Sequence, residues 1–134
     1  MTALPPQFNT WFTNRGWSVH PHQADMLARA GEPAQLLIAP TGGGKTLAGF
    51  LPSLVELADG THDGLHTLYV SPLKALAADI KRNLTRPVDE MRLPIRIEDR
   101  TGDTSQSRRR RQRADPPHIL LTTPESLALL TSYE

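Results

Sequence analysis

The stretch that decides the fold is Leu36-Leu37-Ile38-Ala39-Pro40-Thr41-Gly42-Gly43-Gly44-Lys45-Thr46. The apolar run from Leu36 to Ala39 predicts a short strand that is covered on both faces. Apolar residues from Leu47 to Ala58 then recur with the period of a helix. Three glycines between them let successive backbone N–H groups turn toward an anion, and the start of the helix adds its positive dipole end. The stretch therefore predicts a phosphate-binding loop between a strand and a helix.

The loop follows the pattern G-x-x-x-x-G-K-[ST] at Gly44, Lys45 and Thr46, with Ala39 in place of the first glycine. In that pattern the lysine reaches the β- and γ-phosphates of a nucleotide, and the hydroxyl binds Mg²⁺. Lys45 and Thr46 are therefore the predicted catalytic residues, and Thr46 is also the predicted metal ligand. The residues predicted to bind the nucleotide phosphates are Thr41, Gly42, Gly43, Gly44, Lys45 and Thr46.

The rest of the chain alternates between strand and helix patterns. Two amphipathic helices are expected first, over residues 6–14 and 21–31. Short apolar or alternating runs predict strands at 67–70, 95–98 and 119–122, with 95–98 as a half-exposed edge strand. Helices are expected after them, at 73–84, 105–113 and 124–133. This order predicts an α/β fold with a parallel sheet and flanking helices.

Composition excludes several classes of protein. The 134 residues are one domain's length, and 38% of them are hydrophobic, which is enough for a core. The chain has no cysteine, so it has neither a disulfide framework nor a thiolate metal site. It also lacks a signal peptide pattern and an 18-residue apolar stretch, which argues against a membrane partner and favours the cytoplasm.

Basic residues are concentrated in one part of the chain. The window from Arg92 to Arg113 holds eight arginines against three acidic residues, whereas the whole chain has a net charge of only +1. Local excess charge of this kind suits contact with a polyanion, and arginine suits bidentate contact with phosphate. The run Arg108 to Arg113 is either a nucleic-acid patch or simply the solvated face of a helix.

Several motifs around the loop resemble those of superfamily 2 helicases. Residues 39–46 follow the form Ala-x-Thr-Gly-x-Gly-Lys-Thr, and Gly16-Trp17 with Pro21-His22-Gln23 resembles the Q-motif region of that family. The resemblance implies that Gln23 recognises the adenine of ATP, because an amide can donate and accept hydrogen bonds at once. It also places Trp17 beside the base. Without the loop, Gln23 reads as a surface helix residue.

Three further segments resemble helicase motifs that contact nucleic acid. Ser71 to Leu76 resembles motif Ia, Thr101 to Thr104 a glycine-containing strand-end motif, and Thr122 to Glu125 motif Ib. All three follow predicted strands, at the sheet edge where α/β folds bind ligands. The residues that this resemblance assigns to the nucleic-acid backbone are Pro72, Lys74, Thr101, Gly102, Thr123 and Pro124.

Four stretches resemble the Lhr-type large helicases in particular: Arg15 to Trp17, Leu37 to Thr46, Leu65 to Ala77 and Arg100 to Thr104. With Pro116-Pro117 and Thr122 to Leu127, the resemblance is strongest to the ligase-associated DNA damage response DEXH-box helicases, and it extends from about Leu4 to Glu134. It implies ATP-driven 3′-to-5′ translocation on single-stranded or partly duplex nucleic acid, with DNA favoured over RNA, in a repair context. The implied partners include a ligase or nuclease of a repair operon, and the implied cofactors are ATP and Mg²⁺.

The same resemblance divides the chain into residues 1–32, with the Q-motif-like region, and residues 33–134, an incomplete RecA-like P-loop NTPase domain. The family's motif II, Asp-Glu-x-His, is expected beyond Glu134. Asp89-Glu90 is not a substitute, because it follows a helix rather than a strand, and it reads as a solvated acidic pair. In the family, strands from later in the sequence pair with the strand before the phosphate loop. The 134 residues alone are therefore expected to be inactive and poorly folded.

Two other functional classes remain open from the residues alone. A P-loop kinase or another NTPase would use Arg108 to Arg113 as a lid over an acceptor, but it has no need of the loops at 71–76 and 122–125. A nucleic-acid-binding module with a vestigial phosphate loop would bind DNA without any affinity for nucleotide.

Overall fold

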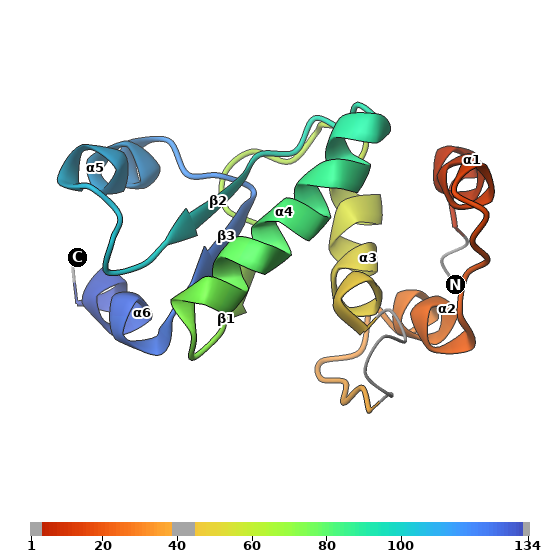
Figure 1. Ribbon diagram of the computed structural model, residues 1–134, viewed down its shortest axis with the longest axis horizontal. Coiled ribbons are helices and arrows are strands. Elements are labelled where there is room, and N and C mark those ends of the chain that lie inside the picture. Colours follow the sequence, from red (N-terminus) through yellow and green to blue (C-terminus); the bar gives the residue numbers. More distant parts are fainter. Residues whose placement is uncertain (1–3, 39–44, 133–134) are drawn as a thin grey trace.

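The computed structural model describes residues 4–38 and 45–132, and it shows a parallel sheet flanked by helices (Figure 1). The three strands are β1 (Thr67–Val70), β2 (Ile97–Arg100) and β3 (Ile119–Thr122), in the order β1-β3-β2. Both pairings are parallel, and each strand is followed in the chain by a helix. The predicted α/β fold with a parallel sheet is confirmed.

Six helices surround this sheet in the described part of the chain. Figure 1 shows α4 crossing the sheet, α5 and α6 at one end of the molecule, α1 and α2 at the other, and α3 between α4 and those two helices. The helices are α1 (Pro6–Asn14), α2 (Pro21–Ala28), α3 (Lys45–Leu57), α4 (Lys74–Glu90), α5 (Gln106–Ala114) and α6 (Pro124–Thr131). None of the described helices is long and apolar enough to cross a membrane.

The core lies between α3, α4 and the sheet. Ile119 and Leu121 of the central strand are fully buried, and so are Leu54 of α3 and Ala77 of α4. Each of these helices contributes the apolar stripe that its 3.6-residue period predicts. The stripe of α4 continues past the predicted end at residue 84, through Val88, so the helix runs on to Glu90.

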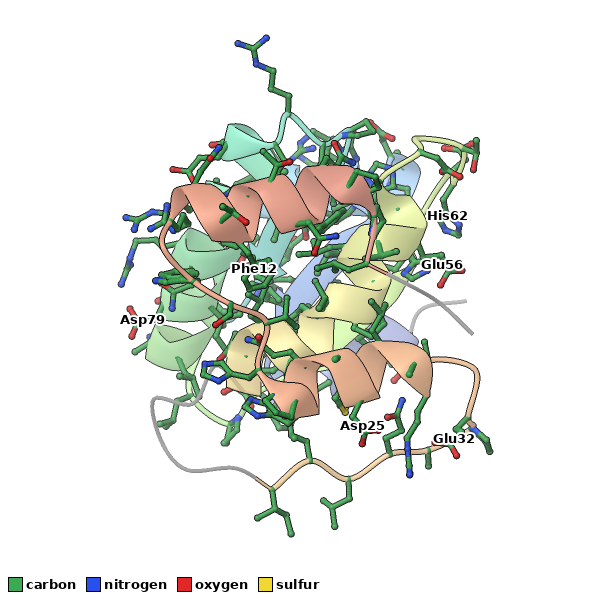
Figure 2. All side chains as sticks on the ribbon, turned by 90° about the vertical axis from the view of Figure 1, so that its right-hand side faces the viewer. Phe12, Asp25, Glu32, Glu56, His62 and Asp79 are labelled. Carbon is green, nitrogen blue, oxygen red and sulfur yellow. The ribbon has the colours of Figure 1, made fainter. Side chains whose placement is uncertain are left out.

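The N-terminal helix α1 packs on the side of α3 and α4 that faces away from the sheet. Phe8, Trp11 and Phe12, spaced i, i+3, i+4, are its buried residues. Figure 2 shows α1 and α2 lying across α3 and α4, with Phe12 directed inward beneath α1. A polar contact adds to this packing, since Trp11 Nε1 donates a hydrogen bond of 2.8 Å to Glu90 Oε1 at the end of α4.

The predicted strand at 36–39 is wrong for residues 36–38, and Ala39 lies outside the described residues. These residues belong to no strand, and the side chains of Leu36 and Ile38 are 86% and 85% exposed. An apolar run shows that a segment needs cover on both faces, but a strand also needs neighbours to pair with. Residues 36–38 pair with none of the described strands.

Other boundaries also differ from the predicted ones. The third expected strand begins at Ile97 rather than at residue 95 and runs to Arg100. Ile95 is buried before the strand begins, in a tight turn in which its N–H bonds to the Leu93 carbonyl at 2.9 Å. The alternating pattern of residues 95–98 therefore reflects which side chains are buried and does not give the bounds of the strand. The prediction of an edge strand is confirmed, because β2 lies at the edge of the sheet. Helix α2 ends at Ala28, three residues before the expected end at Gly31.

Candidate nucleotide and nucleic-acid site

The predicted phosphate loop is described only at its C-terminal end. Thr41, Gly42, Gly43 and Gly44 lie outside the described residues, and so does the side chain of Lys45. The helix predicted to follow the loop is present, because α3 begins at Lys45. Thr46 lies in the first turn of α3 with an exposed side chain, which is where a hydroxyl for a metal ion would have to be.

A cavity of about 450 Å³ lies between the start of α3 and helices α1, α2 and α4. Its walls bring together residues that the sequence linked to nucleotide binding through separate motifs, namely Trp17, Gln23 and Thr46. Its size is that of an ordinary small-ligand pocket, and its surface is largely apolar with a few polar groups. Other residues that line it are Trp11, Phe12, Arg15, His20, Leu47 and Asn83.

Gln23 is held rigidly at the start of α2. Pro21 occupies the first turn of the helix, and the Gln23 side chain is 2% exposed. Its Oε1 accepts a hydrogen bond of 2.9 Å from the backbone N–H of His20, which caps the first turn. The helix therefore fixes the orientation of the amide that lines the cavity.

Trp17 is brought to the cavity by a left-handed turn after α1. Gly16 has φ +71°, a conformation that glycine adopts without strain. The Trp17 N–H then bonds back to the Phe12 carbonyl at 2.9 Å. The indole ring is half exposed and meets the Trp11 ring edge-on, with centroids 5.6 Å apart. The Arg15 guanidinium lies over the Trp17 ring at 4.6 Å.

The three predicted nucleic-acid loops lie along one edge of the sheet. Val70 and Arg100 both pair with Thr122, so the strands end at the same level. The N–H of Ser71 bonds to the Thr122 carbonyl at 3.0 Å, and the Thr122 hydroxyl donates to the Arg100 carbonyl at 2.7 Å. The loops after β1, β3 and β2 are thereby held side by side.

The residues predicted to contact nucleic acid fall into two groups. Pro72, Lys74, Gly102 and Pro124 are exposed along this edge. The Lys74 ammonium forms an ion pair of 2.9 Å with Asp103, which joins the loops that follow the two outer strands. These exposed residues form the part of the edge that a backbone of phosphates could reach.

The two threonines of the predicted set are buried and shape the loops instead. The Thr101 hydroxyl accepts a hydrogen bond of 3.2 Å from the N–H of Asp103, and the Thr101 N–H donates to the Thr104 hydroxyl at 2.9 Å. The Thr123 hydroxyl donates to Ser126 at 3.1 Å in the first turn of α6. We expect these two side chains to act on nucleic acid through the loop shape that they impose.

Helix α5, which carries the arginine run, turns much of its charge toward β2. Arg108 pairs with Asp99 at 3.3 Å and Arg111 with Glu98 at 2.8 Å. Burial opposes ionisation of Glu98, but the hydrogen bonds from Arg111 and Gln112 outweigh it and lower the pKa of this carboxyl. These two arginines are therefore structural, and the solvated-face and nucleic-acid interpretations both stay open for exposed Arg110.

Glu90 has a role that the sequence did not suggest. Asp89 and Glu90 are both exposed, as predicted for a solvated acidic pair, but Glu90 also binds Trp11 and Arg15 of the N-terminal region, the latter at 2.9 Å. These partners are 79 and 75 positions away in the chain, so no local pattern could have revealed the contact.

No group of three His, Cys, Asp or Glu side chains suited to a metal ion occurs among the described residues.

Comparison with known proteins agrees with this geometry. The DEAD/DEAH box helicase family matches residues 20–134. An Lhr helicase/probable uracil glycosylase of Mycolicibacterium smegmatis is 46% identical over 90% of this chain, which spans 9% of that protein. An ATP-dependent helicase Lhr-Core of Saccharolobus solfataricus is 38% identical over 94% of this chain, which spans 16% of it. The chain thus spans less than a fifth of the length of these relatives.

A solved structure shares the same fold. The Mycobacterium smegmatis helicase Lhr bound to ssDNA and AMP-PNP superposes with a TM-score of 0.78. It is 44% identical and covers 94% of this chain, which corresponds to 18% of that structure. The expected Lhr-type resemblance and the partial RecA-like helicase fold are both confirmed.

Proposed function

We propose that this chain, which belongs to the DEAD/DEAH box helicase family, provides the ATP-binding part and a section of the DNA-binding surface of an ATP-dependent helicase. The observation that carries the proposal is the cavity, which joins Gln23, Trp17 and Thr46 beside the first turn of α3. A nucleotide base against Gln23 would direct its phosphates toward the helix start. A bare phosphate loop would not need this base pocket.

ATP and Mg²⁺ fit the residues around that helix start. Gln23 would bind adenine with its fixed amide, and Trp17 would pack beside the base. Thr41 to Gly44 would contribute backbone N–H groups to the phosphates, Lys45 would bind the β- and γ-phosphates, and the exposed Thr46 hydroxyl would bind Mg²⁺. When bound, the metal ion supplies charge neutralisation for phosphoryl transfer to water. The AMP-PNP in the mycobacterial structure supports the choice of an adenine nucleotide.

Nucleic acid would bind along the carboxyl edge of the sheet. Lys74 would pair with a phosphate, and Gly102, Pro72 and Pro124 would allow the backbone to approach the loops closely. Thr101 and Thr123 would keep those loops in shape. The mycobacterial relative holds ssDNA, which supports DNA as the partner. ATP binding and hydrolysis would drive 3′-to-5′ translocation.

Finer aspects of the function also remain proposals. They are the division at residue 32, the ligase-associated subgroup, the repair context, a ligase or nuclease partner, and a cytoplasmic location. The Lhr relatives support the helicase class from which these proposals start.

The proposal predicts DNA-dependent ATP hydrolysis by the full-length protein. Turnover should rise when single-stranded DNA is added, and a partly duplex substrate with a 3′ tail should be unwound. Since phosphate contacts release counterions, log affinity should fall against log salt concentration with a slope of about −0.7 per contact. A steady-state ATPase assay and a strand-displacement assay measure these effects. Phosphate transfer to a small acceptor, or DNA binding with no nucleotide affinity, would contradict the proposal.

Two arginines of α5 distinguish a DNA contact from a structural role. Arg111→Glu would place a third carboxylate beside Glu98 and Asp115 and should lower the thermal unfolding temperature, since it replaces an ion pair with repulsion. Arg110→Glu is the matched control for folding, because Arg110 is exposed and no ion pair joins it to another described residue. If Arg110 contacts DNA, this variant should weaken binding and flatten the salt slope at unchanged stability. If the DNA affinity and its salt dependence are unchanged in Arg110→Glu, Arg110 lies on a solvated helix face and does not contact DNA.

A further inference from the structure

We propose that Glu90 is a positioning residue for the nucleotide base: it fixes Arg15, and Arg15 in turn fixes the Trp17 ring in the wall of the cavity. This inference rests on the proposed function, because it assigns the cavity to a base. It adds a residue that lies outside every nucleotide motif recognised in the sequence.

The contacts form a continuous chain from α4 to the cavity. Glu90 Oε1 accepts hydrogen bonds from Trp11 Nε1 at 2.8 Å and from Arg15 Nη1 at 2.9 Å, and its Oε2 lies 3.3 Å from the same Arg15 nitrogen. The central carbon of the Arg15 guanidinium lies over both indole rings, 4.6 Å from the Trp17 centroid and 5.4 Å from that of Trp11. Trp11, Arg15 and Trp17 all line the cavity.

Glu90 supplies the charge that this arrangement needs. The hydrogen bond from Trp11, followed by the Arg15 charge, holds the pKa of Glu90 below its usual range, so it is a carboxylate at neutral pH. Arg15 Nε is buried without a hydrogen-bond partner among the described residues, so its contact with Glu90 holds the guanidinium at its other end. Because the arginine side chain has several rotatable bonds, this anchor determines whether its planar guanidinium stays over the face of the indole.

Trp17 depends on that support more than a core residue would. Half of its surface is exposed, and it follows a left-handed glycine turn rather than lying within a helix. The ring therefore has Trp11 on its edge and Arg15 over its face to hold it in place. A base that packs against a prearranged ring loses less affinity to ordering than one that packs against a mobile ring.

The test separates base recognition from phosphate binding. In the full-length protein we would measure the affinity of ATP and of inorganic tripolyphosphate, which has the phosphates but no base. Glu90→Gln should weaken ATP about tenfold, as expected for loss of one aromatic wall, and leave tripolyphosphate unchanged. The turnover rate at saturating ATP should change by less than about twofold, since KM rather than kcat carries the defect.

Two further variants keep the result interpretable. Asp89→Asn removes the same charge one residue away, at an exposed side chain for which no bond to another described residue is found, and it should match the wild type. Arg15→Lys keeps the charge opposite Glu90 but loses the flat guanidinium, so it should reproduce the selective loss of ATP affinity even if Glu90→Gln does not fold.

Each remaining outcome decides against the inference. Equal weakening of ATP and tripolyphosphate would show that Glu90 only supports the fold, and unchanged ATP affinity would show that it does not act on the base at all. If the wild type binds tripolyphosphate as tightly as ATP, the base pocket itself is wrong and the proposed function fails with it. If the wild type binds ATP more tightly than tripolyphosphate but Glu90→Gln has no effect, the proposed function stands and Glu90 has no part in base binding.

Discussion

The variant Lys45→Ala of the full-length protein is expected to lose ATP hydrolysis by about a hundredfold or more. Lys45 is the first residue of α3, directly after the three glycines, and it is the one cationic side chain of the predicted loop. Phosphoryl transfer depends on charges positioned around the γ-phosphate, and loss of one such group at a dry site typically costs 10²–10³ in rate.

The matched control is Arg82→Ala. Arg82 is exposed on α4, its described ion pair is with Asp79 on the same helix, and its own side chain does not line the cavity. Its removal should leave ATP turnover within about twofold of the wild type, since exposed pairs of this kind contribute little to stability. Steady-state phosphate release measures both variants. Near-normal turnover by Lys45→Ala would remove the phosphate-loop assignment, and the helicase mechanism with it.

Much of the fold follows from local patterns in the sequence. The i, i+3, i+4 spacing of Phe8, Trp11 and Phe12 predicted α1 with its exact bounds, and the run Ile119 to Thr122 predicted the fully buried central strand. Helix periodicity is a property of a few consecutive turns, so it can be recognised without knowledge of the rest of the chain.

Features that depend on distant neighbours were not predictable in this way. The strand expected at 36–38 lacks a neighbour, and the contact between Glu90 and Trp11 joins residues 79 positions apart. The acidic partners of the arginine run belong to the same class, since Glu98 and Asp99 lie on β2 and face the helix that follows it. A sequence shows that such groups need cover or a counter-charge, but the fold determines where they find it.

For the candidate site too, local patterns predicted part of the result and the fold determined the rest. The segments that resemble helicase motifs gave the residues around the cavity, because each motif is a short local pattern. Their roles depend on which side chains face outward. Lys74 is exposed at the sheet edge, whereas Thr101 and Thr123 of the same predicted set are buried. The buried threonines bond within their own loop or to the first turn of α6, and no motif predicts that.

The second large effect is expected in the amide hydrogen exchange of the 134-residue polypeptide. The amides of Leu37 and Ile38 should exchange at close to the rate of an unfolded chain, whereas those of Leu120 and Leu121 should be protected up to the global stability. Residues 36–38 pair with no described strand and Ile38 is 85% exposed, while β3 is paired on both sides. For a global stability of about 5 kcal/mol, the exchange rates of the two groups should differ by about three and a half orders of magnitude.

A longer polypeptide that continues past Glu134 with the family's motif II and motif III strands is the matched comparison. Those strands are expected to pair with residues 36–39, so Leu37 and Ile38 should there approach the protection of Leu121. Without them, Leu36, Ile38 and the half-exposed Leu68 and Val70 of the edge strand β1 leave apolar surface in water, and the short polypeptide should aggregate as its concentration rises. Exchange followed by mass spectrometry resolves these segments in both proteins. Protection of Leu37 and Ile38 near the global value in a monomeric 134-residue chain would show that they find partners within it, against the arrangement argued here.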